Sequence, residues 1–237
     1  MTQPLPLCVF SVQHTGTWFA CEFLLSLKNS FGHEREHVFQ WHKLENGEQR
    51  LPFAALNGRK PVIVSHLAGG ADGPTDEHRG KHITIGLARN LAEYWPTVVP
   101  LRDPLLSLIT RQLRHPERDH GYIIDAFCEL WKLAGNVHWL PIDVGERPLD
   151  RKDRLVEITA KILGGWTRET EDFLTQWIAP AYNVTPPEHP LKLAYRTGDF
   201  GEIHAAFPEE FDLLLERRGE IRELLEPIGY QLPWWNL

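Results

Sequence analysis

Short runs of almost continuously apolar residues recur along the chain, separated by segments whose apolar positions have helical spacing. A run without polar alternation is typical of a strand that is buried on both faces, as in a parallel sheet flanked by helices. The strands predicted in this way are 6–12, 61–67, 97–102 and 136–142, with a further short strand at 38–44. The predicted helices are 17–29, 83–94, 104–114, 121–134, 151–163, 168–178 and 208–227.

The alternation of strands and helices predicts an α/β fold, a three-layer doubly wound domain with a central parallel sheet. Residues 69–82 are rich in glycine and charge and are predicted to form a loop after a strand. Residues 180–190 contain too many prolines for a helix or a central strand. Because no shift in composition divides the chain, we expect residues 1–237 to form one domain.

Charge narrows the range of partners. The 237 residues carry a formal net charge of −7, and lysine and arginine never form a run longer than two. A nucleic-acid duplex or an anionic membrane surface needs a denser display of positive charge, so neither is expected as a partner. A compact anion such as a nucleotide needs only a few local donors, so the charge does not exclude a nucleotide as the ligand.

The cysteines indicate the compartment. Cys8, Cys21 and Cys128 are few, odd in number and set in apolar segments. They are predicted to be small buried side chains rather than disulfide partners, which suits a reducing environment. No stretch has the length and apolar character of a signal peptide or a membrane span. We therefore expect a cytoplasmic protein.

The sequence Gln-His-Thr-Gly-Thr at residues 13–17 joins the first predicted strand to the first predicted helix. The first N–H groups of a helix have no partner within it and lie at the positive end of its dipole, so this turn is a candidate anion site. Gly16 allows an anion to approach closely, and Thr15 or Thr17 is a candidate to cap the helix or donate a hydroxyl. The alternative is an ordinary turn with a threonine cap. The Gly-Lys-Ser/Thr ending of a triphosphatase loop is absent.

Two further segments place candidate catalytic or ligand-binding side chains at the ends of predicted strands. His66 lies at the end of one strand and Arg102 at the end of another, where open α/β sheets bind their ligands. Asp103 is predicted to cap the helix that follows, and Thr110 comes two turns later. Taken alone, His66 would be a strand-end histidine bonded to backbone.

A fourth segment, Tyr-Arg-Thr-Gly-Asp-Phe-Gly at 195–201, is predicted to be a loop that presents Arg196. The guanidinium fork matches a phosphate dianion with paired hydrogen bonds, which makes Arg102 and Arg196 candidate phosphate ligands. The alternative for each arginine is a surface or ion-paired side chain.

These four segments, in this order, resemble the sulfotransferase family that uses 3′-phosphoadenosine 5′-phosphosulfate (PAPS). The resemblance covers residues 6–207. The loop that binds the 5′-phosphosulfate is similar to Gln13, His14, Thr15, Gly16, Thr17, Trp18 and Phe19. The segment of the catalytic base is similar to Val64, Ser65, His66 and Leu67. The elements around the 3′-phosphate are similar to Arg102 with Thr110, and to Arg196, Thr197, Gly198, Asp199, Phe200 and Gly201.

The resemblance implies a P-loop-like fold and transfer of a sulfuryl group from PAPS to a hydroxyl or amine of a small-molecule or glycan acceptor, without a metal. His66 would be the general base. His14 stands where the family has a lysine, and it would partly replace that lysine if it is protonated or donates a hydrogen bond. Trp18 or Phe19 would stack on the adenine, and Ser107 offers a second hydroxyl near Thr110.

Departures from the family keep other functions open. The family's lysines are absent at His14 and at Val64, which leaves a nucleotide-binding module without turnover as one alternative. A P-loop kinase of a nucleoside or small metabolite is the other, and the missing Gly-Lys-Ser/Thr argues against it. Residues 33–37 spell His-Glu-x-x-His, but the preceding glycine and the crowded charges favour a solvated connection over a zinc site. The aromatic tail at 233–237 is predicted to pack in the core.

Overall fold

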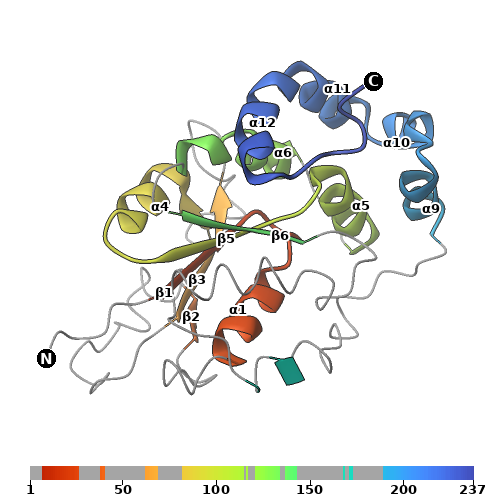
Figure 1. The fold of residues 1–237 in the computed structure, drawn as a ribbon. Helices are drawn as coiled ribbons and strands as arrows, with labels where there is room; N and C mark the ends of the chain where they lie inside the picture. The colour runs from red at the N-terminus through yellow and green to blue at the C-terminus, as the bar shows by residue number, and fades with distance from the viewer. Residues whose placement is uncertain are drawn as a thin grey trace, which may run out of the picture.

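The computed structural model describes residues 7–26, 38–40, 62–68, 82–114, 116, 121–133, 137–142, 168, 171–172 and 189–237. Within these ranges the centre of the fold is a parallel sheet (Figure 1). Its strands are β1 (Leu7–Ser11), β2 (Val38–Gln40), β3 (Val62–Ala68), β4 (His82–Thr84), β5 (Thr97–Leu101) and β6 (Val137–Pro141). The predicted α/β class with a central parallel sheet is therefore confirmed.

The strands run in the order β2–β3–β1–β5–β6, and each neighbouring pair is parallel. β2 pairs with the first half of β3 and β4 with its second half, both on the edge of β3 that faces away from β1. Counted without the short β2, the order is 3-2-1-4-5, which is consistent with a Rossmann- or P-loop-like fold. The carboxyl ends of parallel strands share one edge, so the residues that follow β1, β3 and β5 are brought together.

Helices cover both faces of the sheet in the described part of the chain (Figure 1). Successive side chains of a strand point to opposite faces. From β1, Cys8 and Phe10 join a large core cluster with buried residues of α5 (Pro104–Arg114) and α6 (Gly121–Cys128). On the other side lies α1 (Thr17–Ser26), which buries Phe23 and Leu24. Burial on both faces explains why the strands are continuously apolar.

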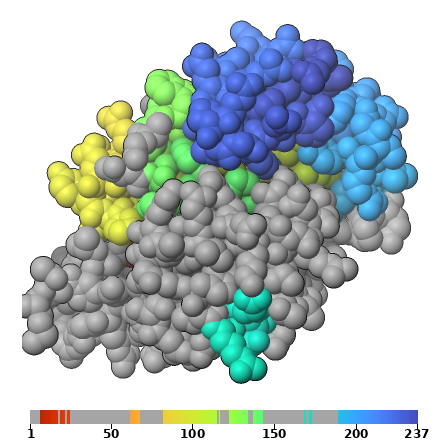
Figure 2. Space-filling model, in the orientation of Figure 1, coloured from red at the N-terminus to blue at the C-terminus, as the bar shows by residue number. Residues whose placement is uncertain are grey.

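The C-terminal helices form a contiguous layer outside α5 and α6 (Figure 2). They are α9 (Pro190–Thr197), α10 (Phe200–Ala206), α11 (Pro208–Glu216), α12 (Arg218–Leu225) and the 3₁₀ turn η5 (Glu226–Ile228). Phe207, Phe211 and Trp234 belong to the same core cluster as Phe10. Trp234 is fully buried, so the predicted packing of the aromatic tail is confirmed for this residue.

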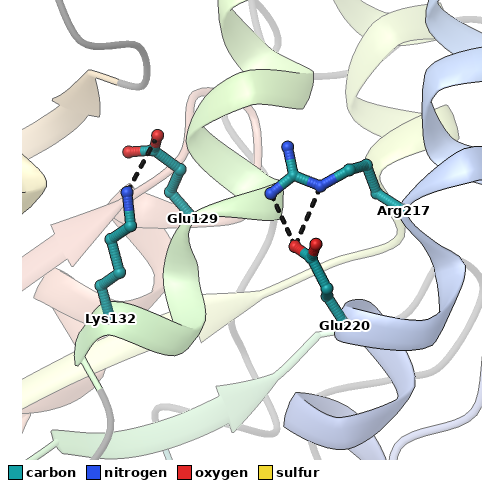
Figure 3. A network of polar contacts seen from close by, with 4 residues as sticks. All are labelled: Glu129, Lys132, Arg217 and Glu220. Atoms are coloured by element: carbon teal, nitrogen blue, oxygen red, sulfur yellow. Dashed lines mark hydrogen bonds and ion pairs between the residues drawn. The ribbon is translucent and has the colours of Figure 1, made fainter.

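Two ion pairs lie where α6 and the 3₁₀ turn η2 (Leu130–Leu133) meet the start of α12 (Figure 3). Lys132 Nζ is 3.1 Å from Glu129 Oε1. Arg217 donates from Nε and Nη2 to Oε2 of Glu220, at 2.9 and 2.6 Å. The side chains are partly exposed, so each pair contributes at most about 1 kcal/mol and apolar packing dominates this contact.

Most predicted elements are present, and their ends differ in ways that have local causes. The predicted helix at 83–94 is α4 (Ile85–Ala92), which begins later because residues 82–84 pair with β3 as β4 and Thr84 caps the helix. His82, assigned to a loop by its sequence, is therefore a strand residue. The predicted helix at 208–227 is interrupted at Arg217, between α11 and α12. The prediction at 151–163 lies outside the described residues.

Helix α9 begins at the last residue of the proline-rich stretch 180–190, of which only residues 189 and 190 are described. Pro190 does not end the proline-rich stretch in a loop but occupies the first turn of α9, where the missing N–H costs nothing. The three cysteines are buried and are not joined in disulfides, as predicted. Among the described helices, none combines the length and the apolar character that a membrane crossing requires.

Candidate functional site

The turn between β1 and α1 has a backbone that few residues tolerate. His14 (φ 63°) and Gly16 (φ 94°) are both in the left-handed region. Between them, the buried Thr15 donates its hydroxyl to the carbonyl oxygen of Val12 at 2.7 Å. A Cβ on Gly16 would stand 2.5 Å from Cδ1 of Ile142, so a side chain there requires Ile142 to move. The hydrogen bond from the Thr15 hydroxyl to Val12 thus stabilises the turn from within.

Hydrogen bonds join the end of β3 to the start of α1. Ser11 Oγ lies 2.6 Å from Thr17 Oγ1 and 3.2 Å from Nδ1 of His66. Ser11 and Thr17 are buried, whereas His66 is partly exposed. Ser11 and His66 are direct partners in the register of β1 and β3. The parallel sheet thus brings the candidate base His66 to the candidate anion turn.

A second set of contacts joins Gln13, a predicted loop residue, to His82 and Tyr122, to which the sequence assigned no role. Gln13 Nε2 lies 3.0 Å from Nε2 of His82, and the hydroxyl of Tyr122 donates to Oε1 of Gln13. Because the amide nitrogen donates to Nε2 of His82, a neutral His82 carries its proton on Nδ1. The rings of His82 and His66 meet edge to face, with centroids 5.7 Å apart. No local signal in a glycine-rich stretch marks residue 82 as a strand partner of His66.

Positive charge gathers beside the turn. We define the cationic cluster as Arg102, Arg111, Arg114, Lys192 and Arg196. Burial and then the charges of Arg102, Arg114 and Arg196 lower the pKa of Lys192 to about 8. These groups come from the end of β5, from α5 and from α9, so segments distant in sequence contribute to one electrostatic environment.

His14 in the turn is affected both by burial and by these charges. Burial, followed by the charges of Arg114, His66, Arg111 and Arg102, lowers the pKa of His14 to about 3. Its imidazole is therefore neutral at neutral pH in the unliganded protein. Among the described residues, its buried Nε2 atom has no hydrogen-bond partner.

Arg102 and Asp103 organise the end of β5. Arg102 donates from Nη1 to the carbonyl oxygen of His14 at 2.9 Å. The buried carboxylate of Asp103 accepts a hydrogen bond from the N–H of Leu105 at 2.9 Å, which confirms the predicted cap of α5. It also accepts from the hydroxyl of Tyr195 at 2.6 Å and from Nε1 of Trp234 at 3.1 Å to each oxygen. These bonds attach α9 and the aromatic tail to the site.

Two neighbouring residues of α5 hold buried polar atoms that lack partners in the described part of the chain. Thr110, a predicted site residue, has its Oγ1 buried without a hydrogen bond. Ser107, its predicted substitute, instead lies 3.4 Å from the carbonyl oxygen of Asp103. Arg111 is 3% exposed, and its Nε and Nη2 atoms have no partner. The sequence feature that could have identified Arg111 as a site residue is its charge among the apolar residues of α5.

The late segment differs from its prediction. Residues 195–201 do not form a loop: Arg196 and Thr197 end α9, and Gly198 is its left-handed cap with φ 77°. The Thr197 hydroxyl donates to the carbonyl oxygens of Leu193 and Ala194, within the same helix. The helical ends are fixed by Gly198 and by the Asp199 side chain, which accepts from the first turn of α10. Arg196 alone of this segment joins the cationic cluster.

The remaining predicted residues are placed as follows. Phe19 is buried and its ring stacks on Phe23, with centroids 6.3 Å apart, so it packs in the core under α1. The side chain of Trp18 and residues 33–37 lie outside what the structure describes. The described residues contain no group of three or more histidine, cysteine, aspartate or glutamate side chains placed to hold a metal ion.

No family model matches the chain, and no curated protein matches it in sequence. A function must therefore be proposed from the geometry of the described residues.

Proposed function

We propose that the protein binds PAPS at the carboxyl ends of β1, β3 and β5 and transfers its sulfuryl group to a hydroxyl or amine of a small-molecule or glycan acceptor. The observation that carries this proposal is the convergence of the β1–α1 turn, the cationic cluster and His66. PAPS carries negative charge at two separated positions, the 3′-phosphate and the 5′-phosphosulfate. Cations that extend from the turn to Arg196 suit a ligand of this kind. The domain is then a P-loop-like sulfotransferase fold.

The proposed contacts divide between the two charged ends. The first N–H groups of α1 and the Thr17 hydroxyl would hold the 5′-phosphosulfate. Arg102 would hold the 3′-phosphate, with Arg196 adding positive charge. The buried and unpartnered Thr110 hydroxyl is the further donor that supports this end.

His66 is the proposed general base. If Nδ1–H of His66 donates to Ser11 and Ser11 donates to Thr17, the lone pair on Nε2 of His66 is the one that takes a proton from the acceptor. The acceptor oxygen or nitrogen then bonds to sulfur as the bond from sulfur to the bridging oxygen breaks. The acceptor's proton goes to His66, and adenosine 3′,5′-bisphosphate leaves. The protein's part is to align the reactants and stabilise the charge that develops.

His14 enters this mechanism as a neutral group. Its low pKa supports hydrogen-bond donation to the bridging oxygen rather than a formal positive charge. A bound dianion would raise that pKa toward its ordinary value, because it stabilises the protonated imidazole.

Calorimetry and a transfer assay test the proposal together. We expect adenosine 3′,5′-bisphosphate to bind without a metal and at least tenfold more tightly than ATP with Mg²⁺. Release of the bisphosphate from PAPS should increase with one or more members of a panel of hydroxyl and amine acceptors. His66→Asn should abolish this release and leave bisphosphate affinity within about threefold of the parent.

The alternatives give different results. Tighter binding of ATP with Mg²⁺ would contradict the proposal and favour a small-metabolite kinase. Tight bisphosphate binding without turnover on any acceptor would favour the binding module that the neutral His14 allows. Full transfer activity in His66→Asn would remove His66 from the mechanism.

A further inference from the structure

Arg111 is a buried cation with two donor atoms, Nε and Nη2, that find no acceptor among the described residues. It lies in the interior part of α5 and is 3% exposed. Its Nε and Nη2 atoms make no hydrogen bond, and no ion pair joins Arg111 to a carboxylate among the described residues. An arginine keeps its charge in proteins, and a buried charge without a partner destabilises the fold. Such a group is a candidate ligand for an anion.

The unpartnered atoms form one edge of the guanidinium. Nε–H and the outer N–H of Nη2 point in the same direction and can donate to two oxygens of one anion. Arg217 of the same protein shows this edge in use, because its Nε and Nη2 atoms both donate to Glu220 (Figure 3). The same edge of Arg111 suits a tetrahedral oxyanion.

The position of the guanidinium follows from its neighbours. Its central carbon lies 6.0 Å from the centre of the Tyr122 ring, and the Tyr122 hydroxyl donates to Gln13 in the turn. Its charge also acts on His14, the next residue of the turn. The contact with the Tyr122 ring stabilises the charge but supplies no acceptor for the N–H groups of Nε and Nη2. Arg111 is thus next to the turn whose other donors are the backbone N–H groups of α1.

We propose that Arg111 binds a tetrahedral oxyanion at the β1–α1 turn and supplies the positive charge that the neutral His14 does not. The assignment of that oxyanion to the sulfuryl end of PAPS rests on the proposed function. The binding of an oxyanion by Arg111 does not, since a simple phosphate or sulfate group satisfies the same donors.

Arg222 is a matched control within the chain. It also stacks on an aromatic ring, with its central carbon 5.4 Å from the centre of Trp235, and its Nε is also buried without a partner. Unlike Arg111, it donates from Nη2 to the carbonyl oxygen of Trp235 at 2.7 Å and to Asn236 at 3.1 Å. Replacing Arg222 removes these hydrogen bonds, whereas the described residues accept none from Nε or Nη2 of Arg111.

The test uses inorganic pyrophosphate, with thermal unfolding and calorimetry as readouts. In the parent, pyrophosphate should bind and raise Tm. Arg111→Met should have an unliganded Tm equal to or above that of the parent, and its pyrophosphate affinity should fall at least tenfold. Arg222→Met should have a lower Tm and parental pyrophosphate affinity. Arg111→Lys, which keeps the charge without the two-donor edge, should fold and lose affinity severalfold.

Several results would overturn the proposal. They are a parent that does not bind pyrophosphate, an Arg111→Met variant whose affinity stays within twofold, or an Arg111→Met variant that loses Tm as Arg222→Met does while keeping its affinity. If Arg111→Met does not fold, unchanged pyrophosphate affinity in Arg111→Lys has the same meaning.

A second comparison assigns the oxyanion. Arg111→Met should weaken PAPS binding at least fivefold more than binding of adenosine 3′,5′-bisphosphate, which lacks the sulfuryl group. Equal losses would overturn the sulfuryl assignment and place Arg111 on the 5′-phosphate. The two proposals can also fail separately. If the parent is inactive with PAPS but Arg111→Met loses pyrophosphate affinity, the proposed function is refuted and the oxyanion site at Arg111 is retained.

Discussion

Arg102 donates a hydrogen bond from Nη1 to the backbone carbonyl of His14, across 88 residues of sequence. The contact joins the end of β5 to the turn after β1, and it helps to hold His14 in its left-handed conformation. Burial lowers the pKa of Arg102, yet an arginine remains charged at neutral pH. One nitrogen thus supports the turn while the charge of the group contributes to the candidate anion site.

The proposed 3′-phosphate contact of Arg102 predicts a selective loss of affinity. Arg102→Met should weaken binding of adenosine 3′,5′-bisphosphate about 30-fold or more, because it removes a charge-assisted hydrogen bond of roughly 1.5–3 kcal/mol together with long-range attraction. Binding of adenosine 5′-monophosphate should fall only severalfold, through the lost bond to His14. Calorimetry with both nucleotides measures the two losses. Equal losses would show that Arg102 acts only through the turn.

Gly16 is predicted to be irreplaceable for two separable reasons. Gly16→Ala combines a positive φ with a Cβ that would collide with Ile142, and it should reduce the free energy of unfolding by about 2–4 kcal/mol. Gly229→Ala also has a positive φ, 70°, but no atom within 4 Å of its Cβ, and it should cost only about 1 kcal/mol. Urea unfolding measures both values.

A double variant separates the collision from the backbone strain. Ile142→Val removes the Cδ1 atom that a Cβ on Gly16 would meet at 2.5 Å. Gly16→Ala with Ile142→Val should therefore recover part of the stability that Gly16→Ala loses. If the two effects simply add, steric contact with Ile142 is not the reason that Gly16 is required.

The elements near the sheet were predictable from sequence, for a physical reason. Strands buried on both faces are continuously apolar, and parallel strands place their carboxyl ends at one edge. The position of Arg102 directly after β5 followed from this rule, whereas His66 lies two residues before the end of β3, level with Ser11 at the end of β1. The Asp103 cap was readable because the caps of helices depend on a few adjacent residues.

Contacts between distant segments were not predictable in this way. Trp234 donates to Asp103 across 131 residues, and no local pattern marks either as the partner of the other. His82 is a strand residue because it pairs with His66 in β3, a contact between segments that are separated in the sequence. Arg111 interrupts an apolar helix, and its burial beside Tyr122 depends on how α5 and α6 pack.

Asp103 is predicted to couple the stabilities of α9 and the aromatic tail. Tyr195→Phe and Trp234→Phe each remove a donor to its buried carboxylate and should each cost about 1–3 kcal/mol of unfolding free energy. Together they should cost more than the sum, with a coupling of about 0.5–3 kcal/mol, because the double variant removes both aromatic donors from the same buried carboxylate.

Urea unfolding of the two single variants and the double variant measures this coupling. Tyr94→Phe is the control for loss of a tyrosine hydroxyl, since Tyr94 is 73% exposed and should tolerate the change within about 0.5 kcal/mol. Strict additivity would mean that Tyr195 and Trp234 stabilise the fold independently of their shared carboxylate.

His14 is predicted to make stability depend on pH below neutrality. Its pKa is about 3 in the folded chain and near 6.5 when unfolded, so between these values the unfolded state binds a proton that the folded state does not. Stability should therefore rise with pH across this window, by up to about 1.4 kcal/mol per unit from this one group, and show no contribution from it above pH 7. Burial is the largest cause of the low pKa of His14, and the charged or titratable groups that add to it are Arg114, His66, Arg111 and Arg102.

His14→Asn isolates this contribution, because asparagine tolerates the left-handed backbone and does not titrate. The difference in unfolding free energy between parent and variant should shift with pH from 4.5 to 7 and stay constant from 7 to 8, in buffers without phosphate or sulfate. Other titrating groups are common to both proteins and cancel in the difference. Added pyrophosphate should flatten the parent's dependence, because a bound anion raises the pKa of His14 toward its unfolded value. A pH-independent difference would mean that His14 is not held neutral by its burial and the surrounding arginines.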